Sequence, residues 1–221
     1  MGKRGPKPKK IIDTKWSGNL AYAIGLITTD GCLSKDGLLI DLTSKDREQL
    51  KNFSKCLKIN FTICTKYSNN KDKCLRIQFK NRIFYDFLLS IGITPAKSKT
   101  LDKILIPDGY FFDFLRGCFD GDGCFYSYWD PRWKSSFMFY TEFSSASPKF
   151  IKWLQIKVNQ LACIKGHVTT SGRNQTMGQL KYAKRESMIL LKKMYHSKNI
   201  IFLSRKKLKI NKALGIVGKK I

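Results

Sequence analysis

The stretch LRGCFDGDGCF at residues 115–125 is the strongest indication of the fold, because an earlier stretch repeats its pattern. Residues 23–33 read AIGLITTDGCL. Aligned, the two stretches pair Gly25 with Gly117, Asp30 with Asp122, Gly31 with Gly123 and Cys32 with Cys124. A lone Asp-Gly pair usually marks a turn. Two copies of G-x-x-x-x-D-G-C, 92 positions apart (25 to 117), indicate instead an internal duplication with one acid in each copy.

The composition points to a polyanionic partner. The chain has 221 residues, of which 43% are hydrophobic, enough for one or two compact domains with a core. It carries 42 Lys and Arg against 16 Asp and Glu, a net charge of +26, which opposes compaction unless a polyanion neutralises it. No apolar run approaches the ~18 residues of a membrane-spanning helix. The charge therefore favours nucleic acid over a membrane surface.

The cysteines and the N-terminus indicate in which cellular compartment the protein works. Seven cysteines form no C-x-x-C pair and there are only two histidines, so we expect neither a structural zinc site nor disulfides. Apolar neighbours predict that Cys32, Cys118 and Cys124 are small core residues. The N-terminus MGKRGPKPKK lacks the apolar segment of a secretory signal, which indicates an intracellular, reduced protein. We expect residues 1–12 to form a basic arm, either solvated or lying along DNA.

Each copy of the motif has helical spacing. Apolar residues at positions 20, 23, 24 and 27 predict a helix over residues 20–29, and the repeat predicts a second over 110–121. Gly25 and Gly117 lie inside these helices, where glycine costs roughly 1 kcal/mol relative to alanine. Such glycines are explained if the two helices pack with their backbones close together. Gly31 and Gly123 are expected to end the helices as C-terminal glycine caps.

Alternating apolar and polar residues after each helix predict two hairpins separated by a helix. The predicted order is αββαββα, written twice, in an α+β fold with a first subdomain at 13–106 and a second at 107–221. Strands of this kind make a sheet with one covered and one open face. We interpret the open face as the nucleic-acid platform, with phosphate or water contacts as the alternative. Its candidate residues are Lys66, Ser68, Arg76, Gln78, Tyr126, Tyr140, His167, Thr169, Gln179 and Lys181.

Residues 23–31 and 115–123 resemble the paired motifs of the LAGLIDADG homing endonucleases, in the branch that carries both motifs in one chain. The resemblance implies a monomer in which the two motif helices form the central interface. It implies two saddle-shaped sheets that lie in the major groove of double-stranded DNA. It also implies cleavage of both strands across the minor groove with Mg²⁺ or Mn²⁺, in a protein encoded by an intron or an intein.

The paired acids have a physical rationale of their own. A carboxylate at a helix C-terminus is disfavoured by the macrodipole, and two neighbouring carboxylates repel each other. A divalent cation removes both penalties and supplies Lewis-acid chemistry. By resemblance, Asp30 and Asp122 are the metal-binding acids, and Thr29 and Gly121 lend backbone carbonyls. Asp120 has no acidic counterpart in the first copy, so we expect it to cap a helix or serve the interface.

Basic residues near the scissile phosphates vary in this family, and Lys97 and Lys206 are the candidates here. Each could stabilise the transition state, contact a phosphate or be solvated. The sequence predicts a site-specific DNA endonuclease. Two alternatives stay open: a maturase that binds intron RNA, and a DNA-binding regulator that does not cut.

Overall fold

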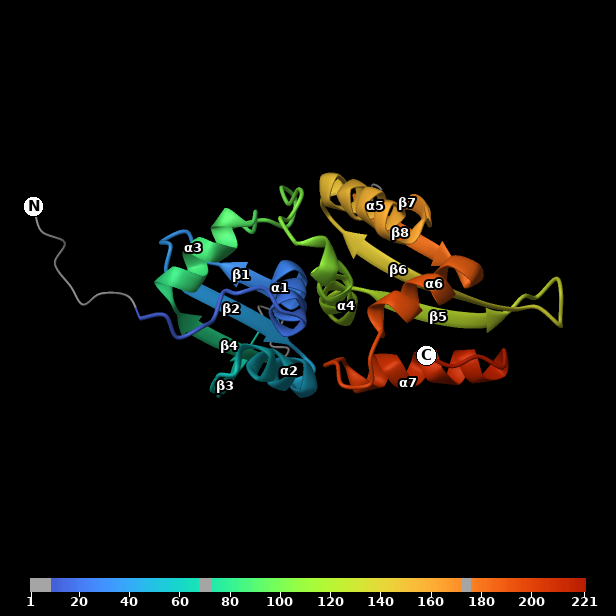
Figure 1. Ribbon diagram of the computed structural model, residues 1–221, viewed down its shortest axis with the longest axis horizontal. Coiled ribbons are helices and arrows are strands. Elements are labelled where there is room, and N and C mark those ends of the chain that lie inside the picture. Colours follow the sequence, from blue (N-terminus) through green and yellow to red (C-terminus); the bar gives the residue numbers. More distant parts are fainter. Residues whose placement is uncertain (1–8, 68–72, 172–175) are drawn as a thin grey trace, which may run out of the picture.

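The computed structural model describes residues 9–67, 73–171 and 176–221. It confirms an α+β fold built from two similar halves (Figure 1). The first half contains α1 (Gly18–Asp30), β1 (Gly31–Leu33), β2 (Leu39–Ser44), α2 (Arg47–Leu57), β3 (Ile63–Tyr67), β4 (Lys73–Lys80) and α3 (Arg82–Ser90). The second contains η1 (Asp108–Tyr110), α4 (Phe111–Gly121), β5 (Cys124–Trp129), β6 (Phe137–Ser145), α5 (Pro148–Ala162), β7 (His167–Ser171), β8 (Met177–Ala183), α6 (Lys184–Met194) and α7 (Ser204–Ile216).

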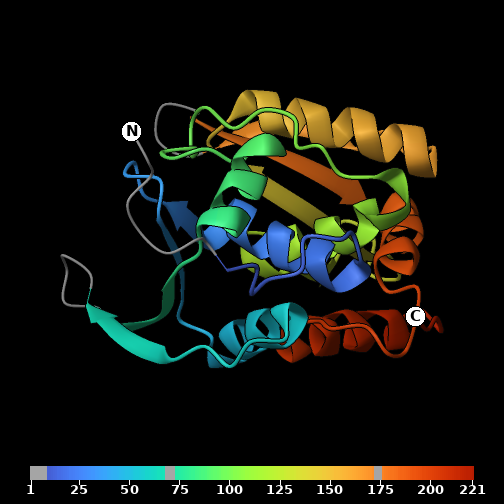
Figure 2. The same ribbon diagram turned by 60° about the vertical axis from the view of Figure 1, so that its left-hand side comes forward.

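Each half forms a four-stranded antiparallel sheet. The strand orders are β1-β2-β4-β3 and β5-β6-β8-β7, so the two sheets have the same topology. The expected αββαββα order is present in both. The motif helices α1 and α4 lie side by side between the sheets, while α5 runs along the second sheet (Figures 1 and 2).

Helix α7 was not predicted, and it extends the second half beyond the repeat. Its buried residues are Lys206, Ile210, Ala213 and Leu214, which follow helical spacing. The first of them is a lysine, which a search for apolar periodicity does not count. The helix also begins without a side-chain cap at Leu203. The start of α7 meets α2 of the first half (Figure 2).

The strands alternate as their sequence predicts. In the first sheet Ile40, Leu42 and Ile77 are fully buried against the helices, and in the second Phe139 and Leu180 are. Because successive strand residues point to opposite faces, the residues between them lie on the open face. Large side chains fill the space under the sheets, so each half has its own part of one continuous core.

Two local expectations were wrong. Cys118 is buried, but Cys32 and Cys124 are exposed, because each is the strand residue that follows a glycine turned toward the helix. Neither motif glycine is a left-handed cap: Gly123 has no positive φ, and Gly31, with φ −89° and ψ 154°, is extended backbone. Glycine is needed there for space: a Cβ would lie 2.7 Å from the Cα of Ile27.

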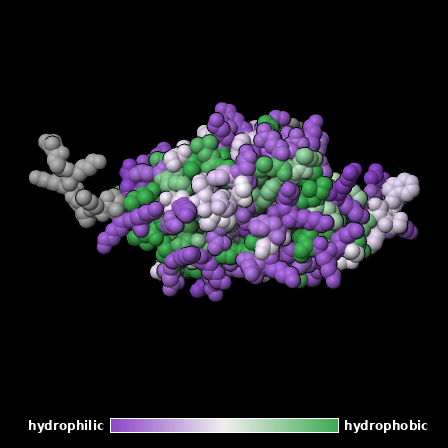
Figure 3. Space-filling model, in the orientation of Figure 1, coloured by the Kyte–Doolittle hydropathy of each residue, from purple (hydrophilic) through white to green (hydrophobic). Residues whose placement is uncertain are grey.

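The surface is strongly hydrophilic. Hydrophilic residues cover much of the face seen in Figure 3, and hydrophobic ones are scattered among them. Across the described ranges, no helix has the length and apolar character that a membrane crossing needs.

Candidate active site and nucleic-acid interface

Helices α1 and α4 touch through their glycines. A Cβ on Gly25 would lie 2.7 Å from the backbone nitrogen of Cys118 and 2.8 Å from the Cα of Gly117. A Cβ on Gly117 would lie 3.0 Å from the Cα of Gly25. Real Cβ atoms do not approach backbone so closely, so only glycine permits this contact. The contact brings the C-terminal ends of both helices to the same edge of the molecule.

Asp30 and Asp122 meet at that edge. Burial, reinforced by the charge of Asp122, raises the pKa of Asp30 to about 6. Burial also raises the pKa of Asp122, although Lys206 and Lys97 partly oppose it. The amide of Gln49 on α2 donates to Asp30 Oδ2. Asp30 is half-buried and Asp122 beside it is exposed, so two carboxylates of like charge come together at an edge that solvent reaches.

The residues around this pair fit a divalent cation. A Cβ on Gly121 would lie 2.9 Å from Asp30 Oδ2, so the carboxylate of Asp30 faces the space that the missing side chain leaves open. The same Cβ would stand 2.8 Å from the Cβ of Thr29. Among the described side chains no group of three or more His, Cys, Asp or Glu could hold a metal. Two carboxylates completed by carbonyls, water and substrate phosphate suit Mg²⁺, which is rarely caged by protein alone.

Lys97 and Lys206 flank the acids from opposite halves, and both are buried. Lys97 Nζ donates to the carbonyl of Gly31. Lys206 Nζ donates to the carbonyls of Gly123 (2.7 Å) and Gly121 (3.1 Å). Burial lowers the pKa of Lys97, and it lowers that of Lys206 to about 8. The Gly121 carbonyl thus already accepts one hydrogen bond, and its second lone pair stays available for a cation.

Asp120 lies in the interface and away from the cation space. It is fully buried. Its Oδ2 accepts from the hydroxyl of Tyr22 on α1 at 2.7 Å and from the backbone N–H of Leu203 at 2.8 Å. Burial raises the pKa of Asp120 to about 6, although the hydrogen bond from Tyr22 acts to lower it. One carboxylate therefore ties the two motif helices to the segment that leads into α7.

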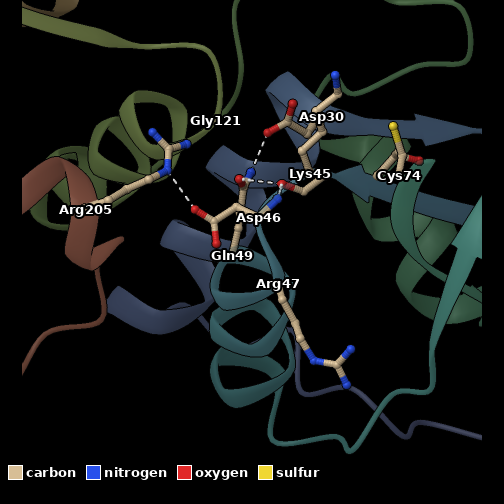
Figure 4. Close-up of a pocket in the computed structure, with 10 residues that line it drawn as sticks. Asp30, Lys45, Asp46, Arg47, Gln49, Cys74, Gly121 and Arg205 are labelled. Carbon is tan, nitrogen blue, oxygen red and sulfur yellow. Dashed lines mark hydrogen bonds and ion pairs between the residues drawn. The ribbon is translucent and has the colours of Figure 1, made fainter. Parts of the chain in front are cut away.

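A cavity of about 620 Å³ opens beside the acid pair. Its lining residues are Asp30, Thr43, Ser44, Lys45, Asp46, Arg47, Gln49, Cys74, Gly121 and Arg205. In Figure 4, Gln49 points to Asp30, Arg205 points to Asp46, and Arg47 extends away from them. The cavity offers basic side chains next to the carboxylates, which is the environment that a phosphodiester requires.

The first open face carries most of its expected residues. Lys66, Arg76 and Gln78 lie on one face of neighbouring strands, around Asp41 of β2. Ser68 lies outside the described residues. Arg76 Nε is buried and has no hydrogen-bond partner among the residues that the structure describes.

The second open face is more aromatic. Tyr126 stacks on Tyr140 with 5.3 Å between ring centroids, and Tyr128 also stacks on Tyr140, at 6.2 Å. Beyond them the paired strands β7 and β8 present the other expected residues. These are His167 opposite Lys181 and Thr169 opposite Gln179. All four lie on the same face as the tyrosines, because residues paired across neighbouring strands, and every second residue along a strand, point to the same face of the sheet.

Three residues escaped the sequence reasoning: Gln49, Asp41 and Glu142. Gln49 stands three residues after the N-cap Asp46, a spacing typical of a capping box, yet its amide reaches Asp30. Nothing local marks that redirection. Asp41 and Glu142 do have a signal, since each is the acid on the polar face of a predicted strand.

No protein-family model and no curated protein sequence matches the chain. Solved structures do. The homing endonuclease I-WcaI bound to its DNA recognition sequence has a TM-score of 0.61 at 15% identity, covering 93% of this chain and 94% of I-WcaI. I-DmoI in complex with DNA and Mn has a TM-score of 0.52 at 12% identity, covering 83% of this chain and 98% of I-DmoI.

Full-length DUF199/WhiA from Thermatoga maritima also matches, with a TM-score of 0.56 at 14% identity over 96% of this chain. The chain spans 65% of the length of that protein. Similarity at these identities concerns the fold, and the fold agrees with the motifs at residues 23–31 and 115–123. The chain has the two-motif LAGLIDADG fold of the single-chain homing endonucleases, as the resemblance of its motifs predicted.

Proposed function

We propose that this protein is a site-specific endodeoxyribonuclease that cuts both strands of a long, asymmetric DNA target with Mg²⁺ or Mn²⁺. The observation that carries the proposal is the pair formed by Asp30 and Asp122. A half-buried and an exposed carboxylate, both with raised pKa values, meet at the end of packed helices, in a protein with a net charge of +26. Structural ion pairs do not explain this arrangement, because the two partners have the same sign.

Asp30 and Asp122, with the carbonyls of Thr29 and Gly121, would hold the cation. When bound, the cation would supply Lewis-acid activation of water and stabilise the leaving oxygen. Gln49 orients Asp30 by donating its amide to Oδ2, the carboxylate oxygen that also faces the space over Gly121. Burial keeps this carboxylate in a low-dielectric site, where its interaction with a cation is strengthened.

Lys97 and Lys206 act on the phosphate. Each is anchored on glycine carbonyls at the end of a motif helix, so its ammonium is held beside the acids. A cation positioned in advance stabilises charge that develops on the phosphorane oxygens. A lysine whose pKa is lowered to about 8 also gives up a proton more readily than an exposed one.

The open faces bind the duplex, and one chain is sufficient. Residues 13–106 and 107–221 each contribute one motif helix, one acid and one sheet, so we expect a monomer on DNA. The two faces differ in chemistry, with Arg76 and Gln78 on one and stacked tyrosines on the other. An asymmetric target follows from that difference.

The experiment is incubation with a randomised duplex library and Mg²⁺, followed by sequencing of the ends. We expect paired breaks at one preferred site and no breaks with EDTA. Asp30→Asn and Asp122→Asn should abolish cleavage and leave DNA binding largely intact. Asp86→Asn, which removes an exposed carboxylate on α3, is the matched control and should cut normally. Full cleavage by Asp30→Asn would overturn the proposal.

The same library separates the two alternatives. Tight, sequence-specific binding without any break in Mg²⁺ or Mn²⁺ would identify a regulator that does not cut. Binding that an intron RNA outcompetes at equal nucleotide concentration would identify a maturase.

A further inference from the structure

Among the described residues, each open face carries one acid, and the two acids occupy equivalent positions. Asp41 on β2 lies opposite Cys32 of β1, and Glu142 on β6 lies opposite Cys124 of β5. The two cysteines are matched residues of the duplicated motif, so the acids are matched as well. A carboxylate on this surface repels a DNA backbone. The repetition of that feature in a protein of net charge +26 therefore calls for a physical account.

Asp41 is the centre of the polar groups on the first face. The hydroxyl of Thr43 donates to Asp41 Oδ1 at 3.0 Å, and the amide of Gln78 donates to Oδ2 at 3.3 Å. Arg76 Nη1 lies 3.5 Å from the same Oδ2, and Lys66 Nζ lies 3.9 Å from it. The donors that we expect to read bases thus converge on one carboxylate.

Glu142 has the same kind of surroundings on the second face. The hydroxyl of Ser144, two residues further along the strand, donates to Glu142 Oε1 at 3.2 Å. Lys181 Nζ, from the neighbouring strand, lies 3.6 Å from Glu142 Oε2. Each half therefore repeats the same arrangement: an acid, a hydroxyl at the second residue after it, and a cation from the adjacent strand.

Stability does not explain these acids. An ion pair whose basic partner is partly exposed contributes little to folding, too little to favour an acid on a surface that meets a polyanion. Orientation explains them better. A carboxylate only accepts hydrogen bonds, so it holds Arg76, Gln78 and Lys66 over the bases and away from the phosphates. Long basic side chains without such a partner reach phosphates of any sequence.

We propose that Asp41 and Glu142 are specificity-determining residues of the two open faces. Each holds the base-reading donors of its own sheet in one arrangement, and each weakens binding to DNA in general. The inference rests on the proposed binding of DNA by these faces. It does not depend on cleavage. If it is correct, removing the negative charge of either acid raises the affinity for random duplex and lowers the discrimination between base pairs.

The test uses Asp41→Asn and Glu142→Gln, which keep the shape and the hydroxyl partner of each acid. Binding to a randomised duplex library is measured by selection and sequencing in Ca²⁺, together with dissociation constants for the best site and for random duplex. We expect each variant to bind random duplex several-fold more tightly. We also expect a loss of discrimination of ~5- to 100-fold per base pair. The loss should be confined to a few adjacent base pairs, in opposite half-sites for the two variants.

Asp86→Asn on α3 is the control for net charge, and it should leave base preference unchanged. Thermal unfolding of all three variants checks that the fold is intact. Unchanged base preference in both Asp41→Asn and Glu142→Gln would overturn the inference. So would weaker binding to every sequence, or a wild-type protein that binds all duplexes equally. Failure of the endonuclease assignment would show as absent breaks in Mg²⁺ with these binding profiles intact, so the two failures are distinguishable.

Discussion

Arg205 at the start of α7 binds Asp46 at the N-cap of α2, with 2.7 Å between Nε and Oδ2. A helix of the second half is thereby held by the first half. Asn52 of α2 strengthens this contact by donating to the carbonyl of Phe202 at 2.8 Å. Lys206 is the next residue after Arg205, so α2 positions a lysine of the candidate active site.

The other lysine is held in the same crossed manner. Ser147, the N-cap of α5 in the second half, donates through its hydroxyl to the carbonyl of Leu101. Leu101 stands four residues after Lys97 in the first half. Each lysine segment is therefore anchored at the N-terminus of a helix in the opposite half.

We expect Asp46→Asn to reduce cleavage more than binding. Asparagine preserves the helix cap, while the ion pair with Arg205 is lost. Because that pair is exposed, stability should change by no more than about 1 kcal/mol. A small displacement of Lys206 should lower the single-turnover cleavage rate roughly 10-fold. Asp86→Asn, which removes the exposed Arg82 pair on α3, is the control. Parallel losses of binding and cleavage would count against a positioning role.

Gly117→Ala should destabilise the protein severely. The new Cβ would overlap the backbone of α1, and overpacking of this kind costs typically 1–3 kcal/mol or more. Gly215→Ala near the end of α7 is the matched control, because a Cβ there meets nothing within 4 Å. Urea unfolding monitored by circular dichroism compares the two. Equal stability of the two variants would show that the helices are not in close contact.

Thiol labelling should test whether the open faces bind DNA. Cys32, Cys64 and Cys124 are exposed on the open faces, whereas the exposed Cys163 ends α5 on the helix side. We expect bound duplex to slow alkylation of the first three and to leave Cys163 unaffected, as measured by mass spectrometry of digested protein. Protection of Cys163 with free reaction at Cys64 would mean that DNA binds the opposite side.

Metal-free protein should lose stability as pH rises through about 6. The pKa of folded Asp30 is raised to about 6 by burial, above its value in the unfolded chain, so ionisation disfavours folding. The stabilising contribution is fully present below pH ~4 and is lost above the folded pKa. In EDTA at pH 7.5, Asp30→Asn should therefore be roughly 1–3 kcal/mol more stable than wild type.

The difference in unfolding free energy between Asp30→Asn and wild type should shrink toward pH 4.5. Because Asp120, whose pKa is also about 6, is present in both proteins, the difference reports on Asp30 alone. Saturating Mg²⁺ should stabilise the wild type and have little effect on Asp30→Asn. Unfolding in urea at each pH gives the free energies. A variant less stable than wild type at pH 7.5 in EDTA would contradict the burial of an ionised pair.

The two motif helices, the order of the strands along the chain and the acids at the helix ends could all be predicted from the sequence. These features depend on local periodicity and on the chemistry of single residues, and both can be read along the chain. The duplication also predicted that Gly25 meets Gly117, since two helices with the same small residue pack most closely there. The family resemblance assigned Asp30 and Asp122 from their motif position alone.

The other contacts between the two halves could not be predicted from the sequence. Tyr22 meets Asp120 across 98 positions of sequence, and Ser204 meets Glu48 across 156. The tertiary structure also leaves Cys32 exposed, brings the amide of Gln49 to the carboxylate of Asp30 and places Asp41 beside Arg76. Such contacts depend on how close the helices pack and on the register of each sheet. Both are set by the packing of the whole core, which no local pattern encodes.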